Sequence, residues 1–100
     1  MLIPAAMADF LGVQHYWDQA LALHQTAWAA ARQAGDRPGQ GRALNLLARA
    51  QIEASDFAAA EATLQQSLAL HRDLGDRGGQ ADALNGLGTV YWHTGARVGR

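Results

Sequence analysis

The sequence contains no cysteine and no lysine. Without cysteine the chain can form no disulfide and has no thiol for catalysis, and nothing in it requires an oxidising compartment. All eight basic residues are arginine, and nine acidic residues oppose them, so the formal net charge is −1. A charge so close to zero gives no long-range field to attract nucleic acid or an anionic membrane surface. We therefore predict that neither is a partner.

Long apolar runs are also missing. No stretch approaches the ~18 residues of a membrane-spanning helix. The apolar opening residues lack the basic start of a signal peptide and are interrupted by Pro4 and Asp9. We therefore predict a soluble, cytoplasmic protein. Because 100 residues suffice for one small domain, we predict a single domain over residues 1–100.

An internal repeat organises the residues that are present. Alanine, the strongest helix former, supplies 22 of the 100 residues. Residues 35–47 (GDRPGQGRALNLL) and 75–87 (GDRGGQADALNGL) are identical at nine of thirteen positions when aligned at an offset of 40. Such self-similarity is the signature of a solenoid or array. It predicts about two and a half repeats, over residues 1–35, 36–75 and 76–100, the last one incomplete.

Each repeat is predicted to fold as a pair of antiparallel helices. Asp36 and Asp76 are placed to cap helix starts, because an aspartate there accepts a hydrogen bond from a free backbone N–H. Gly35 and Gly75 are placed to end the preceding helices, since glycine adopts the left-handed conformation without strain. Apolar residues recur between these signals at helical spacing. The pattern predicts helices near residues 3–13, 16–34, 37–53, 57–74 and 77–94.

Two motifs resemble those of a tetratricopeptide repeat. Its first helix is matched by Leu87-Gly88-Thr89-Val90-Tyr91 followed by Gly95, and its second by Phe57, Ala60, Leu64 and Ser67. The period of 40 residues exceeds the ~34 of the family and resembles the longer form found in bacterial multidomain regulators. The resemblance implies an all-α fold in which antiparallel helix hairpins stack as a right-handed α-solenoid.

The resemblance also implies a module that binds a peptide or partner segment on its concave face, as part of a larger regulatory protein. Asn45 and Asn85 share the repeat position at which family members bond a bound peptide backbone. Arg42 and Arg49 are expected to hold an acidic side chain or a C-terminal carboxylate. The alternative is that these side chains are merely solvated. The full predicted set is Arg42, Asn45, Arg49, Asn85, Thr89 and Trp92.

Self-association is the second function left open. A solenoid usually needs about three repeats and capping surfaces to be stable, and the last predicted helix lacks its partner. We expect its apolar side chains to be partly uncovered and to meet a second copy of the chain. The predicted set is Leu84, Leu87, Val90 and Tyr91.

No catalytic, metal or cofactor site is predicted. The four histidines share no repeat position and form no His-x-x-x-His pair. The glycine-rich turns lack the Gly-Lys-Ser/Thr of a phosphate-binding loop. No serine has a base and an orienting acid at the spacing of a known motif. We therefore predict that the protein is not an enzyme and needs no cofactor.

Overall fold

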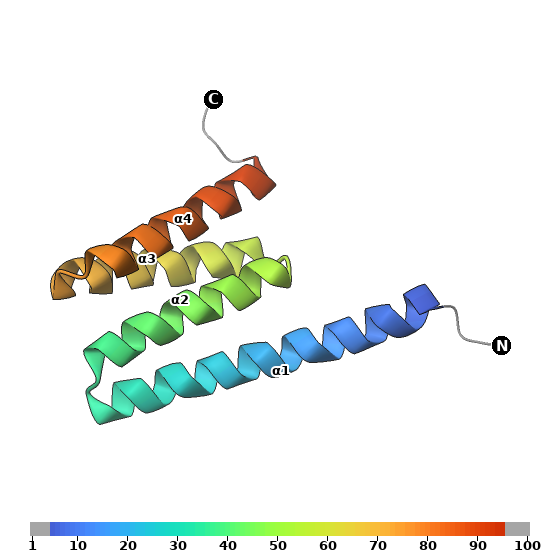
Figure 1. Cartoon of the computed structure of the whole chain (residues 1–100), viewed down its shortest axis with the longest axis horizontal. Coiled ribbons are helices and arrows are strands. Elements are labelled where there is room, and N and C mark those ends of the chain that lie inside the picture. Colours follow the sequence, from blue (N-terminus) through green and yellow to red (C-terminus); the bar gives the residue numbers. More distant parts are fainter. Residues whose placement is uncertain (1–4, 96–100) are drawn as a thin grey trace.

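The computed structural model describes the backbone of residues 5–95 and the side chains from residue 16 onward. These residues form four α-helices and no strand: α1 (Ala5–Ala34), α2 (Arg37–Glu53), α3 (Phe57–Leu74) and α4 (Arg77–Thr94). Successive helices run in opposite directions, and the turns after α1 and α3 lie at the same end of the stack (Figure 1). The predicted all-α repeat fold is confirmed. In this described part, no helix is long and apolar enough to cross a membrane.

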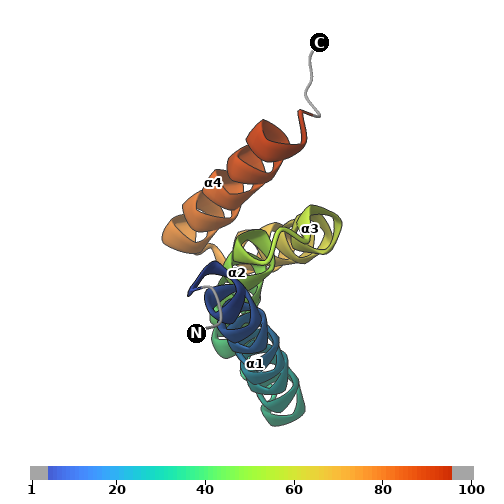
Figure 2. The same ribbon diagram turned by 90° about the vertical axis from the view of Figure 1, so that its right-hand side faces the viewer.

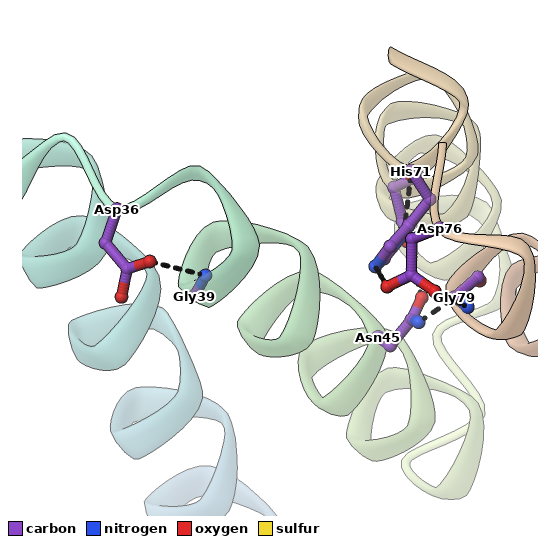
Figure 3. Close-up of polar contacts among 7 residues, drawn as sticks. Asp36, Gly39, Asn45, His71, Asp76 and Gly79 are labelled. Atoms are coloured by element: carbon purple, nitrogen blue, oxygen red, sulfur yellow. Dashed lines mark hydrogen bonds and ion pairs between the residues drawn. The ribbon is translucent and has the colours of Figure 1, made fainter. Parts of the chain in front are cut away.

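Aspartates begin the last three helices. The side chain of each accepts a hydrogen bond from a backbone N–H three residues later, which satisfies one of the free donors of the first turn. The pairs are Asp36 with Gly39 at 2.9 Å, Asp56 with Ala59 at 3.3 Å and Asp76 with Gly79 at 2.9 Å. Figure 3 shows the first of them. The bounds of α2, α3 and α4 agree with those predicted.

The prediction of two separate N-terminal helices is wrong. In place of helices near residues 3–13 and 16–34, α1 is continuous over 30 residues; the predicted start at residue 3 lies outside the described residues. At the repeat offset, the position of the capping Asp56 is taken by Tyr16, whose side chain carries no carboxylate to cap a helix. No proline occurs between residues 5 and 34, so nothing ends the helix. The first part of α1 consequently extends past the end of α2 (Figure 1).

The core is built around α3, which packs against both α2 and α4. Three of its buried members, Ala48, Ala60 and Ala83, come from three different helices. Alanine at these positions lets the backbones approach closely. Leucine and valine side chains complete the cluster: Leu64, Leu68, Leu87 and Val90.

The helix α1 lies outside this cluster and packs against α2. Its packed face is a stripe at helical spacing in which every side chain is partly buried: Trp17, Leu21, His24, Trp28 and Ala31. Helices α2 and α4 also contact one another. The views of Figures 1 and 2 place α1 and α4 as the outermost helices at opposite ends of the stack.

Candidate binding groove

A groove with a volume of about 750 Å³ is formed by residues of α2 and α4, together with two side chains of α3. Arg42, Leu46 and Arg49 contribute from α2, while Leu64 and His71 come from α3. Because both of these α3 residues are buried, they form the floor. The wall opposite α2 is formed by four residues of α4: Asp82, Asn85, Gly86 and Thr89.

The structure brings together five of the six residues predicted to form a binding face. They are Arg42, Asn45, Arg49, Asn85 and Thr89, and all of them line the groove. Trp92 does not line it, and this side chain is 83% exposed. Its repeat counterpart, Ile52, does line the groove, so Trp92 stands one repeat further along the same face. That these side chains bind a partner remains a prediction.

The two arginines present unpaired charges to the groove. Arg42 and Arg49 are exposed, and neither forms an ion pair or side-chain hydrogen bond within the described residues. Two helical turns separate them, or about 10 Å along the α2 axis. Across the groove, Asp82 stands at the repeat position of Arg42 and is also exposed. The charged lining of the groove therefore consists of Arg42, Arg49 and Glu53 on α2, Asp82 on α4 and the capping Asp76.

Asn45 has a structural role that sequence reasoning missed. Its amide oxygen accepts a hydrogen bond from the Ser67 hydroxyl, and its amide nitrogen donates to the Gly79 carbonyl at 3.5 Å. One side chain of α2 thus joins α3 and α4; Figure 3 shows its bond to Gly79. The predicted contact of Asn45 with a bound backbone could use only its second amide hydrogen and the remaining lone pair of its oxygen. Asn85, which has no such side-chain bond within the described residues, keeps its whole amide available.

His71 is the other residue of the groove that sequence reasoning missed. It is 2% exposed and lies between two glycines of different helices. A Cβ added at Gly41 would stand 2.6 Å from its Nε2, and one at Gly79 would stand 2.0 Å from its Cδ2. Only glycine lets both helices approach the imidazole this closely. A glycine inside a helical pattern often marks such an approach, and this was the available signal.

The hydrogen bonds of His71 fix its orientation. Nδ1 lies 2.9 Å from the backbone carbonyl of Ser67, and because a carbonyl only accepts, Nδ1 carries the proton. Nε2 faces the Asp76 carboxylate at 3.9 Å (Figure 3).

Ser67, His71 and Asp76 resemble the components of a nucleophilic site only in composition. The Ser67 side chain is 0% exposed, and its hydroxyl already donates to Asn45. A substrate therefore cannot reach it, and the arrangement serves packing. Among the described residues, no group of three or more potential ligands is placed to hold a metal ion.

The expected exposure of the last helix is corrected for two of its four residues. Leu87 is 6% exposed and Val90 is 1% exposed, because both pack into the core with α3. Leu84 is 52% exposed. Tyr91 is partly buried, and its hydroxyl donates to Glu61 of α3 at 3.0 Å. That hydrogen bond, aided by burial and the charge of Glu61, raises the pKa of Tyr91 above its ordinary value of 10.0.

Comparison with known families agrees with the helical repeat. A family model described as tetratricopeptide repeat matches residues 2–73. The match covers α1, α2 and nearly all of α3, and it stops before α4. No curated protein and no solved structure matches the chain.

Proposed function

Because the chain belongs to the tetratricopeptide repeat family, whose members mediate protein–protein interaction, we propose that its groove binds an extended segment of a partner protein. The segment carries a carboxylate, from an acidic side chain or a C-terminus, which Arg42 and Arg49 bind. Asn85 bonds the backbone of the segment. The domain acts within a larger cytoplasmic regulatory protein, like the bacterial regulators that its long repeat resembles.

The observation that carries this proposal is the state of the two arginines. A guanidinium presents several N–H donors in a planar fork that matches a carboxylate. Arg37, at the start of α2, already pairs with Asp73 at 3.2 Å. Arg42 and Arg49 have no such partner within the described residues and line the groove. Their donors are therefore free for a ligand.

The test is binding of fluorescent peptides by anisotropy. One set carries acidic side chains and a free C-terminal carboxylate, and a matched set has the same sequences with every carboxylate converted to an amide. We expect the acidic set to bind more tightly. Arg42→Ala and Arg49→Ala should each raise Kd roughly tenfold, or ~1.4 kcal/mol, because hydrogen bonds to charged groups contribute about 1.5–3 kcal/mol. Asn85→Ala should have a smaller effect.

Arg72→Ala is the matched control. Arg72 is an exposed arginine of α3 that does not line the groove, so its loss removes the same charge without removing a groove contact. Equal affinity for acidic and amidated peptides would contradict the proposal. So would an effect of Arg72→Ala as large as that of Arg49→Ala, which would indicate attraction by charge alone.

A further inference from the structure

The outer face of α4, defined here as Ala81, Leu84, Gly88 and Tyr91, repeats a face of α2 that is covered. At the offset of 40, its counterparts are Gly41, Leu44, Ala48 and Gln51. All four counterparts are buried, whereas on α4 only Tyr91 is even partly buried. Leu44 is 2% exposed and Leu84 is 52% exposed. Apart from Tyr91, which bonds Glu61 of α3, the face of α4 thus has the composition of a helix interface without a described helix to cover it.

The helix that covers this face of α2 is α3, which uses a stripe of small side chains. Ala60 of the stripe packs in one cluster with Ala48, and Ser67 donates its hydroxyl hydrogen to Asn45. Thr63 lies between them along the stripe, and all three stripe residues are buried. Nearer the end of α3, His71 meets Gly41. These contacts show how a helix of this sequence pattern covers α2.

The same stripe recurs on α1, and there it is mostly exposed. The α1 stripe, defined here as Tyr16, Ala20, Leu23 and Ala27, contains the repeat counterparts of Ala60, Thr63 and Ser67. Leu23 is 65% exposed and Tyr16 is 58% exposed. The stripe lies beside the face that α1 packs against α2, since Ala20 and Leu23 each precede a residue of that face by one position. Its position and composition suit a covering helix of the α4 type.

We propose that the outer face of α4 packs against the α1 stripe of a second copy, in the arrangement that α2 and α3 adopt within one chain. The sizes of facing residues fit this arrangement. Within one chain, the small Gly41 faces the large His71. At the corresponding positions between two copies, the larger Ala81 would face the smaller Ala31. The contact between Ala48 and Ala60 within one chain corresponds to a contact between Gly88 of one copy and Ala20 of the other. Leu84 and Leu23 cover one another, and the interface continues the helix packing of the stack.

One contact of the internal arrangement is not reproduced. Ala27 stands where Ser67 would donate a hydrogen bond, and alanine has no hydroxyl. The amide of Asn85, the counterpart of Asn45, therefore stays free on the side that faces the groove. Self-association and partner binding thus use different groups, and neither proposal depends on the other.

The interface joins two different surfaces, the outer face of α4 and the α1 stripe. When two copies bind, one of them keeps a free α1 stripe and the other keeps a free α4 face. Because α1 and α4 lie at opposite ends of the stack (Figures 1 and 2), further copies add head to tail. Analytical ultracentrifugation from micromolar to millimolar concentration tests this. The average mass should grow past that of a dimer. Leu84→Glu and Leu23→Glu should each remain monomeric.

Mixing the two variants gives the sharpest result. Each variant keeps one intact surface, so an equimolar mixture should form a 1:1 dimer and nothing larger. The matched control is Leu46→Glu, which alters an exposed leucine of the groove and should leave assembly unchanged. Circular dichroism checks that each variant keeps its helix content.

Three results would overturn the proposal. The first is a wild-type chain that stays monomeric at every concentration. The second is either glutamate variant forming species as large as the wild type does. The third is a mixture that stays monomeric although the wild-type chain assembles, which would indicate a symmetric contact of another kind. Loss of peptide binding with assembly intact would concern only the groove.

Discussion

His71 determines how closely α2 and α4 approach α3. Its imidazole lies between Gly41 and Gly79, and its Nδ1 is held by the backbone of the preceding turn. The ring therefore cannot move away from one glycine without moving toward the other. A methyl group on either side must displace backbone as well as side chain.

Gly79→Ala and Gly88→Ala form a matched pair within α4. Gly79→Ala should lower the free energy of unfolding by about 1–3 kcal/mol, because the added methyl overlaps the ring of His71. Gly88 has no neighbouring atom within 4 Å of an added Cβ, so Gly88→Ala should raise stability by up to ~1 kcal/mol through helix propensity. Urea denaturation of dilute protein measures both. Equal effects would show that His71 does not restrict the site.

The residues of the groove differ in how far sequence could predict them. Arg42 and Arg49 lie where helical spacing placed them, because the period of α2 fixes which side chains share a face. Asn45 also lies there, but its engagement by Ser67 and Gly79 depends on contacts between helices. The burial of His71 depends on the same contacts. Spacing along one helix contains no information about them.

Capping chemistry explains which helices were predicted correctly. Asp36, Asp56 and Asp76 each bond the first turn of the helix that follows, so α2, α3 and α4 begin where the sequence indicated. Because residues 14–15 align with the turn between α2 and α3, the repeat predicted a helix break there, but no comparable capping residue is present. A repeat therefore transfers packing positions more reliably than it transfers turns, since a turn depends on one or two particular residues.

The turn that follows α2 contains a residue whose backbone conformation favours glycine. Ser55 has a φ of 64°, while its repeat counterpart, Gly95, has a φ of 69°. A residue with a side chain is strained there by about 1–2 kcal/mol, and the flexibility that glycine adds to the unfolded chain offsets part of this. Ser55→Gly should therefore raise the free energy of unfolding by ~1 kcal/mol and the Tm by roughly 5 °C.

Thermal unfolding followed by circular dichroism measures the effect of Ser55→Gly. Gly75→Ala is the converse control, because Gly75 ends α3 with a φ of 70° and an added methyl has no contact to gain. It should lower the Tm by a comparable amount. A Tm that falls for Ser55→Gly would show that the serine is not strained.

Contacts between neighbouring helices carry the stability of the entire stack, and one of them titrates. The Tyr91 hydroxyl of α4 donates to Glu61 of α3. The same repeat positions are occupied by Gln51 in α2 and Leu21 in α1, and the buried amide oxygen of Gln51 has no hydrogen-bond partner. The α3–α4 contact thus has a polar bond that the α1–α2 contact lacks.

Alkaline pH should weaken the α3–α4 contact. The pKa of Tyr91 is raised above 10.0, first by its hydrogen bond to Glu61, so the folded chain keeps the phenolic proton at a pH where the unfolded chain loses it. The stabilisation is complete below about pH 10 and is lost as pH rises through the folded-state pKa. Denaturation at increasing pH should show a steeper decline for the wild type than for Tyr91→Phe. Parallel curves would contradict this origin.

The charges of the groove bear on the sequence that the proposed ligand would carry. Arg42 and Arg49 line the groove from α2, where Glu53 follows them, and Asp82 lines it from α4. Successive side chains of an extended segment point to opposite sides. A segment lying along the groove therefore turns every second side chain toward the arginines and the intervening ones toward the aspartate. In the proposed complex, an acidic residue beside a basic one would therefore meet opposite charges on the two sides of the groove, and shifting the segment by one residue would reverse both pairings.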